Sequence, residues 1–298
     1  MSPAARGAGP PLGPLAVIGV GQIGGSAALA ARAAGVVSEV IGWSRSAETL
    51  RRAREVGIID RAASSAREAV REAGVVLLAT PVRSLGALAE EIAPALPPGA
   101  LVMDAGSVKA AAIRAVEAHV VAGFVGCHPL AGTERFGPDA AAAELFAGRH
   151  CIICPTARTP AALVERAEQF WRAIGAQPYR MDAELHDRVL GAASHLPHAA
   201  AYALAAAVGG LEAEGGSAAA ALRLLVTTSL RDTTRVAASS PAMWRDIFLD
   251  NHTEVLPLID RLGAALGELR AAIAAGDAAR LEALLEVARA ARGRLVTG

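Results

Sequence analysis

A glycine-rich loop between an apolar run and a helical run constrains this chain more than any other feature. Apolar residues 15–18 lead into the loop, and an alanine-rich stretch at residues 25–34 follows it. In that context the glycines permit a tight turn, close approach of a pyrophosphate, and close helix–strand packing. A glycine turn in an unrelated α/β protein is the alternative. The loop predicts a dinucleotide site formed by Gly19, Gly21, Gln22, Ile23 and Gly24.

Strand-like and helix-like runs alternate through the first part of the chain. We expect strands at residues 15–20, 39–43, 75–79, 101–104, 124–127, 150–154 and 177–181, with helices between them, for example at residues 25–34, 47–56 and 83–95. This alternation is typical of a doubly wound parallel sheet covered by helices. We therefore predict an α/β fold with a Rossmann domain over residues 15–182.

From residue 183 onward the pattern is helical, which predicts an all-helical second domain over residues 183–298. We expect helices at residues 186–208, at residues 218–237 and around residues 243–259 or beyond, then a final pair separated by Gly276 and Asp277, where Asp277 caps the last helix. The apolar stripes of that pair pack either within the chain or against a second copy. We favour a homodimer, because a helical domain of about 115 residues has a limited interior.

The composition excludes several classes of protein. The formal net charge is zero and 53% of the residues are hydrophobic, so nothing attracts a polyanion such as nucleic acid. No apolar run reaches the roughly 18–20 residues of a membrane span. Residues 1–14 are rich in proline and glycine and lack the apolar segment of a signal peptide, so we expect a flexible tail and a cytoplasmic protein.

The cysteines are too few for a disulfide framework. Cys151 and Cys154 have the spacing of half a zinc or redox motif, but they lie in an apolar run. In a strand at residues 150–154 the two thiols would point to opposite faces. We therefore expect structural cysteines.

The choice of cofactor depends on the end of the second strand, about 20 residues after the glycine loop, where a carboxylate would bind the ribose of NAD. The chain has Ser44, Arg45 and Ser46 there instead. An arginine and two hydroxyls suit a 2′-phosphate, so NADP is favoured, with NAD possible. The alternative for Arg45 is an ordinary surface position.

Polar residues follow the third, fourth and fifth strands, where the ligand crevice of an open sheet lies. They include Thr80, which together with Pro81 we expect to contact the cofactor, then Ser107, and then His128, Thr133 and Glu134. A histidine at that edge can accept a proton near neutral pH, although a structural histidine is the alternative.

Two segments of the helical half also carry candidate site residues. His195 and His198 bracket Pro197, which kinks a helix. Asp232 and Arg235 are three residues apart, so on one helix Asp232 would orient Arg235 for a substrate carboxylate. A solvated charged face is the alternative for that pair.

Taken together, these motifs resemble the prephenate/arogenate (cyclohexadienyl) dehydrogenase family of tyrosine biosynthesis. The resemblance runs in one order over residues 15–269 and is carried by the segments 104–109, 128–134, 194–198, 231–235 and 241–248. It implies a Rossmann domain, a helical dimerisation domain and an active site between them. The implied reaction is oxidative decarboxylation of prephenate, arogenate or both, with hydride transfer to NAD(P)⁺ and no metal.

The resemblance also implies roles for individual residues. His128 would take the proton of the substrate's C4 hydroxyl, and Ser107 would hydrogen-bond that hydroxyl or the histidine. His198, with His195 nearby, would line the substrate pocket, Arg235 would bind a carboxylate, and Trp244 would help close the pocket. From their positions we expect Thr133, Glu134 and Asp232 to be substrate-binding residues as well. Glu134 would attract the ammonium of arogenate, but it can equally pair with Arg135 or face water, so the preferred substrate stays open.

Two other functions remain as alternatives. A β-hydroxyacid dehydrogenase or imine reductase shares the layout, but the former would be favoured by a lysine in residues 186–208, where this chain has histidines. A non-catalytic NADP-binding sensor would need none of Ser107, His128 and Arg235. The chain ends at Gly298, so we expect no further regulatory domain, and any feedback by tyrosine would act at the active site.

Overall fold

The computed structural model describes residues 12–121 and 123–296. The expected tail at residues 1–14 lies mostly outside the described residues. Leu12, just after the undescribed part, donates its N–H to the carbonyl of Val36 at 2.9 Å and packs against the core.

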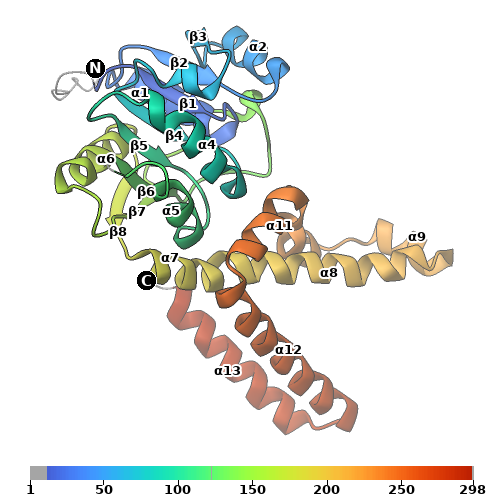
Figure 1. The fold of residues 1–298 in the computed structure, drawn as a ribbon. Helices are drawn as coiled ribbons and strands as arrows, with labels where there is room; N and C mark the ends of the chain where they lie inside the picture. The colour runs from blue at the N-terminus through green and yellow to red at the C-terminus, as the bar shows by residue number, and fades with distance from the viewer. Residues whose placement is uncertain (1–11, 122, 297–298) are drawn as a thin grey trace, which may run out of the picture.

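An eight-stranded sheet organises the first domain (Figure 1), with the strand order β3-β2-β1-β4-β5-β6-β7-β8. The strands are β1 Leu15–Ile18, β2 Val40–Trp43, β3 Arg61–Ala62, β4 Val75–Leu78, β5 Leu101–Asp104, β6 Phe124–Pro129, β7 His150–Cys154 and β8 Gln177–Arg180. The seven predicted strands are confirmed. The sequence pattern missed β3, a two-residue strand at the sheet edge that is too short to show alternation.

The direction of β7 departs from the predicted parallel arrangement. β7 runs antiparallel to β6, whereas β8 is parallel to β7 and the other pairs are parallel. Residues 130–149, which join β6 to β7, contain one short 3₁₀ turn, Pro138–Ala140, and no crossover helix. Without a crossover the chain stays at the same end of the sheet, so the next strand must run back.

Helices cover both faces of this sheet. They are α1 Gln22–Ala33, α2 Ala47–Glu55, α3 Ala66–Ala69, α4 Leu85–Ile92, α5 Ala110–Glu117 and α6 Ala161–Ala173. Alternate strand residues enter two separate cores, as expected for a sheet buried on both sides. Cys151 belongs to one core and Cys154 to the other, which confirms that the two thiols lie on opposite faces. All three cysteines are buried free thiols.

The helical domain begins with a long interrupted helix. After β8, α7 Ala183–Leu190 passes through a π-helical turn at Gly191–His195 into α8 Leu196–Ala213. Pro197 lies in the first turn of α8, where its missing N–H breaks the regular hydrogen-bond ladder. A π turn in a helix is often associated with a functional site.

Two of the predicted helices were wrong in extent. The segment predicted at residues 218–237 is divided into α9 Gly216–Leu224, α10 Thr228–Thr234 and a 3₁₀ turn, Arg235–Ala238. Thr227 starts α10 by accepting the N–H of Leu230 at 3.3 Å. The segment at residues 243–259 is divided at Asn251 into α11 Pro241–Asp250 and α12 His252–Ala275.

The final helix pair is confirmed. α12 ends at Ala275 and is capped by Gly276, whose φ of 62° is the left-handed conformation that glycine adopts most readily. Asp277 then accepts the N–H of Arg280 at 2.9 Å and caps α13 Ala278–Val296.

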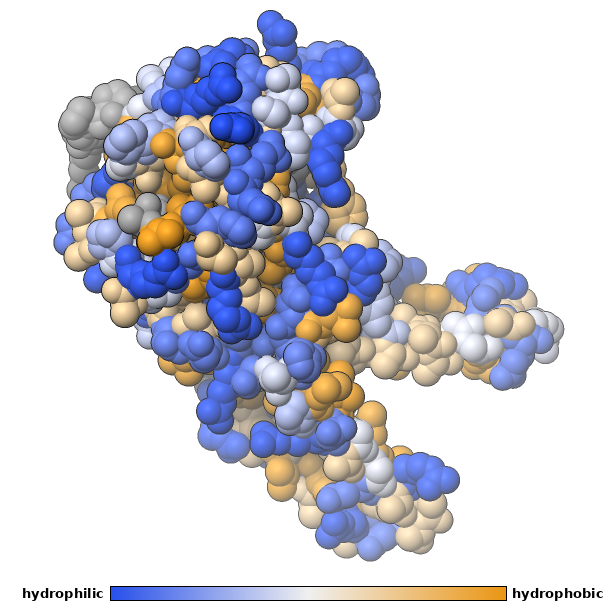
Figure 2. All heavy atoms as spheres, viewed as in Figure 1, coloured by the Kyte–Doolittle hydropathy of each residue, from blue (hydrophilic) through white to orange (hydrophobic). Residues whose placement is uncertain are grey.

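The helical domain is extended (Figure 1): α8 and α9 project in one direction, and the α12–α13 hairpin projects in another. Figure 2 shows hydrophobic side chains along both projections. Large apolar residues are exposed there, among them Leu224, Leu225, Leu266, Ile273, Leu285 and Val287. Among the described residues, no helix combines the length and apolar character that crossing a membrane requires.

Candidate active site

The glycine loop has the geometry that its sequence predicts. Gly19 has a φ of 104°, and a Cβ there would lie 2.5 Å from the carbonyl oxygen of Ala79. A Cβ on Gly24 would collide with the carbonyl oxygen of Gly19. A Cβ on Gly21 would meet nothing within 4 Å. Gly19 and Gly24 therefore shape the turn, while Gly21 leaves open space in front of the N-terminus of α1, where a pyrophosphate fits.

A cavity of about 370 Å³ lies beside this loop. The predicted site residues that line it are Gly21, Gln22, Ile23, Thr80, Pro81, Ser107, His128 and Thr133. The helical domain contributes Met243, Asp246 and Ile247 of α11 to the same cavity. The cavity therefore lies between the two domains, as the resemblance implies.

The side chain of Gln22 ties the glycine loop to the loop after β6. Its amide nitrogen donates to the hydroxyl of Thr133 at 2.6 Å, and its amide oxygen accepts the backbone N–H of Thr133 at 2.9 Å. This two-sided contact holds the segment after His128 next to the predicted phosphate site.

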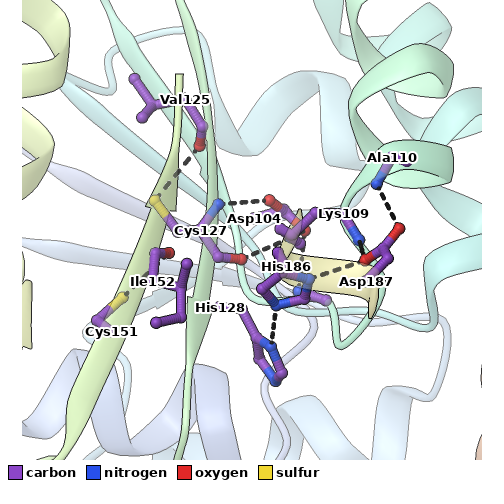
Figure 3. Close-up of polar contacts among 11 residues, drawn as sticks. Asp104, Lys109, Ala110, Val125, Cys127, His128, Cys151, Ile152, His186 and Asp187 are labelled. Carbon is purple, nitrogen blue, oxygen red and sulfur yellow. Dashed lines mark hydrogen bonds and ion pairs between the residues drawn. The ribbon is translucent and has the colours of Figure 1, made fainter. Parts of the chain in front are cut away.

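His128 lies near the end of β6 and is buried. Its Nδ1 is 2.8 Å from Nε2 of His186 (Figure 3). Ser107 lines the same cavity, but the hydrogen-bond partner of the His128 ring is His186. Burial, and secondarily the neighbouring His186 and Lys109, hold the pKa of His128 well below its usual value. The ring is therefore neutral at pH 7 and can accept a proton.

Behind His128 lies a buried ion pair between Asp104 and Lys109, the only lysine in the chain. The Lys109 ammonium also donates to the carbonyl of Cys127 at 2.6 Å. The Asp104 carboxylate accepts the N–H of Cys127 at 2.9 Å. The pair thus holds both backbone groups of the residue before His128. Both residues belong to the motif at residues 104–109, which by itself predicts no role for them.

His186 and Asp187 are functional candidates that were not predicted from the sequence. Both lie on α7 and are buried. Nδ1 of His186 is 2.8 Å from a carboxylate oxygen of Asp187, and the backbone N–H groups of Lys109 and Ala110 donate to the two oxygens at 2.7 and 2.9 Å (Figure 3). The adjacent His and Asp at the start of the helical domain were the available sequence signal for a functional pair. Their partners, His128, Lys109 and Ala110, are distant in sequence, so the signal could not be interpreted.

A second group of aromatic rings belongs to the helical domain, and its Trp244 packs in one cluster with Val108 of the Rossmann domain. Trp244 stacks on His198 with 3.6 Å between ring centroids, and its edge-to-face contact with His195 spans 5.9 Å. The side-chain amide nitrogen of Asn251 donates to Nδ1 of His195 at 2.9 Å and to the backbone carbonyl of Asp187 at 2.8 Å. Burial lowers the pKa of His195 to about 4. His195, His198 and Trp244 do not line the cavity described above.

Arg235 does not pair with Asp232 as expected. α10 ends at Thr234, so the two residues do not share one regular helix face. The Arg235 guanidinium instead forms an ion pair with Glu134, and Asp232 is exposed. This contact connects the loop after β6 to the helical domain. It also gives Glu134 a partner other than Arg135 or water.

The segment after β2 is exposed at Arg45 and half-buried at Ser44. The hydroxyl of Ser46 accepts the N–H of Thr49 at 3.1 Å and caps α2. The Ser46 hydroxyl keeps its own proton free to donate to a ligand.

Several of the predicted site residues do not line the cavity. They are Gly19, Gly24, Ser44, Arg45, Ser46, Glu134, Asp232 and Arg235.

Two family models match consecutive parts of the chain. "Prephenate dehydrogenase, nucleotide-binding domain" matches residues 27–180, and "Prephenate dehydrogenase, dimerization domain" matches residues 182–287. A cyclohexadienyl dehydrogenase of Zymomonas mobilis is 41% identical over 267 residues, covering 88% of this chain and 89% of the relative. A prephenate dehydrogenase of Bacillus subtilis is 33% identical over 266 residues, covering 88% and 71%.

Solved structures are similar over nearly the whole chain. Prephenate dehydrogenase from Aquifex aeolicus, in complex with hydroxyphenyl propionate and NAD⁺, has a TM-score of 0.85 at 32% identity and covers 95% of this chain and 98% of its own. Synechocystis arogenate dehydrogenase has a TM-score of 0.77 at 28% identity, covering 95% and 100%. With both domains matched in order, the chain belongs to the prephenate dehydrogenase family of nicotinamide-dependent oxidoreductases.

Proposed function

We propose that this chain oxidatively decarboxylates prephenate, arogenate or both with NAD(P)⁺. The observation that carries the proposal is the position of His128, a neutral, buried histidine in the same cavity as the glycine loop. Neither a β-hydroxyacid dehydrogenase, an imine reductase nor a nucleotide sensor is favoured, because both family models and the similar relatives agree on one family.

In this reaction the substrate C4–H bond breaks with departure of hydride, the ring carboxylate leaves as CO₂, and its bonding electrons complete the aromatic ring. Bound nicotinamide supplies the hydride acceptor. Nε2 of His128 accepts the C4 hydroxyl proton as hydride leaves and returns it to the ring oxygen, since the product is a phenol. Ser107 lines the same cavity as His128, and we expect its hydroxyl to hydrogen-bond the same substrate hydroxyl. Aromatisation provides the driving force, so the protein mainly orients the substrate and accepts the proton.

The residues present fit a dinucleotide. The open space at Gly21 and the N-terminus of α1 suit the pyrophosphate, and Thr80 and Pro81 line the adjoining cavity. We infer a preference for NADP from Arg45, Ser44 and Ser46, because an exposed guanidinium with two hydroxyls suits a 2′-phosphate. The test is the catalytic efficiency with NADP divided by the catalytic efficiency with NAD. A ratio well below one would contradict that preference.

We also infer that the helical domain forms a homodimer. Its two projections carry exposed apolar residues, including Leu224 at 83% and Ile273 at 65% exposure, and a stable interface would cover such surfaces. The family model for this part is described as a dimerization domain. Light scattering coupled to size exclusion would report twice the chain mass, and a monomer at micromolar concentration would contradict the proposal. A cytoplasmic location stays a prediction.

The direct test is an assay with the purified protein. NADP⁺ or NAD⁺ is combined with prephenate or arogenate, and the absorbance of reduced cofactor is followed together with the release of CO₂. We expect stoichiometric formation of reduced cofactor, CO₂ and a phenolic product. Absence of turnover with all four combinations would refute the proposed reaction.

A further inference from the structure

The hydrogen bonds around His128 form a chain whose direction can be deduced. Both oxygens of Asp187 accept backbone N–H groups, from Lys109 and Ala110, so this carboxylate acts as an acceptor. Nδ1 of His186 lies 2.8 Å from the same carboxylate and must therefore carry a proton. A neutral His186 then has a bare Nε2, which accepts a proton from Nδ1 of His128.

We propose that Asp187, acting through His186, is a positioning residue that fixes His128 as the tautomer with a bare Nε2. This inference rests on the proposed function, in which that nitrogen takes the substrate proton. In Figure 3, dashed lines connect Asp187 to His186 and His186 to His128. Neither Asp187 nor His186 lines the cavity, so both act only through His128.

The donor-to-acceptor direction of these hydrogen bonds depends on His186 being neutral. A charged His186 would donate from both nitrogens, and His128 would then have to accept at Nδ1 and carry its proton on Nε2. His186 is completely buried. Burial first, and then the Lys109 ammonium, lower the pKa of His186 despite the neighbouring Asp187. The buried lysine therefore helps to keep the base in its working tautomer.

The same contacts link the tautomer to the docking of the two domains. Asp187 and His186 belong to α7 of the helical domain, whereas His128 and Lys109 belong to the Rossmann domain. The Asp187 carboxylate caps the N-terminus of α5, and Asn251 of the helical domain donates to the Asp187 carbonyl. Only the docked arrangement places all donors and acceptors together.

Charged and titratable groups surround His128 from several elements. His186 contacts it directly, while Lys109 and His195 act on it over a longer distance. Asp104 and Asp187 lie behind Lys109 and His186, respectively. When His128 becomes protonated, its Nδ1–H keeps its acceptor on His186, and Asp187 supplies the nearest negative charge along the chain of rings. This resembles the role of the aspartate in a catalytic triad, which orients and stabilises an imidazolium.

The first variant is Asp187→Asn. Its NH2 group must replace one of the two carboxylate oxygens, and when it replaces the oxygen nearest His186 it donates to Nδ1 of that ring, which reverses the hydrogen-bond chain and moves the His128 proton to Nε2. We expect kcat to fall by about 10²–10⁴-fold with little change in KM, the range seen when an orienting carboxylate becomes an amide. Glu184→Gln, at an exposed position on the same helix, is the matched control and should retain full activity.

Because Asp187 also caps α5, His186 variants separate positioning from folding. Gln at position 186 keeps an oxygen that can accept from His128, whereas Leu fills the space without an acceptor. We expect His186→Gln to retain at least about tenfold more kcat than His186→Leu. A purely structural role in this buried place would make Leu the better replacement. In the His128→Asn background, His186→Leu should cost nothing further, because its effect passes through His128.

The tautomer itself can be read without any turnover. Long-range ¹⁵N–¹H spectra of the histidine side chains should place the His128 proton on Nδ1 in the wild type and on Nε2 in Asp187→Asn. A wild-type proton on Nε2, or additive losses in the double variant, would overturn the positioning role. An inactive wild type with the expected tautomer would instead refute the proposed reaction and leave the hydrogen-bond chain supported.

Discussion

The carboxylate of Asp104 and the ammonium of Lys109 form an ion pair in which both side chains are 0% exposed. Two charges removed from water are stable only when their other donors and acceptors are satisfied. Here the backbone of Cys127 supplies an acceptor and a donor, and the N–H of Gly106 adds a further donor at 2.9 Å. The pair therefore fixes the end of β6, which carries His128.

Replacing Lys109 with methionine should lower the free energy of unfolding by about 3–5 kcal/mol, because it leaves the Asp104 carboxylate buried without a counter-charge. Urea denaturation followed by circular dichroism would measure the loss. Arg114→Met, at an exposed position on α5, is the control and should change stability by less than about 0.5 kcal/mol. Equal stabilities for the two variants would contradict this account of the pair.

His128→Asn should lower kcat by about 10²–10⁴-fold, the usual loss for a general base, with a modest effect on KM. The asparagine still fits the end of β6 but cannot take a proton. Steady-state kinetics and cofactor titration by fluorescence would separate turnover from binding. Unchanged turnover would show that another group is the base.

Arg235→Gln should chiefly raise the KM for substrate, by about tenfold or about 1.4 kcal/mol, because it removes the cation proposed to bind a substrate carboxylate. The exposed Arg231 on α10 provides the control variant Arg231→Gln, which should leave KM unchanged. A fall in kcat at constant KM would instead assign Arg235 a role in the chemical step.

Arg45→Ala tests the cofactor preference. If the guanidinium binds a 2′-phosphate, the variant should lose about tenfold or more in catalytic efficiency with NADP and almost none with NAD. Arg54→Ala, on the exposed surface of α2, should alter neither value. Equal losses with both cofactors would mean that Arg45 does not distinguish them.

The buried histidines should make the fold sensitive to mild acid. Burial lowers the pKa of His128, His186 and His195 below 6.5 in the folded protein, to about 4 for His195. As the pH falls below 6.5, the unfolded chain therefore binds protons that the folded chain does not, and stability decreases. Each such histidine contributes a slope of up to about 1.4 kcal/mol per pH unit. Urea midpoints at pH 7.5, 6 and 5 should decline in turn; a constant midpoint would argue against neutral buried histidines.

Much of the fold was predictable because its signals are local. Alternating apolar runs predicted seven of the strands, and Gly276 with Asp277 predicted the last helix boundary. Local patterns failed where a break depends on a single cap, as at Thr227, or where no crossover helix intervenes, as before β7. The proposed base also stood out in the sequence, since His128 follows a strand at the ligand edge of the sheet.

The glycine loop, the two-domain order and the family could be predicted from the sequence, because turn chemistry, periodicity and motif spacing depend on neighbouring residues. The side chains that meet across the fold could not. The tertiary structure paired Arg235 with Glu134 rather than Asp232, buried Lys109 against Asp104, and brought His186 and Asp187 of the helical domain to His128. His128 and His186 are 58 positions apart in the sequence. Across such a separation, residue type alone does not identify one contact partner among many.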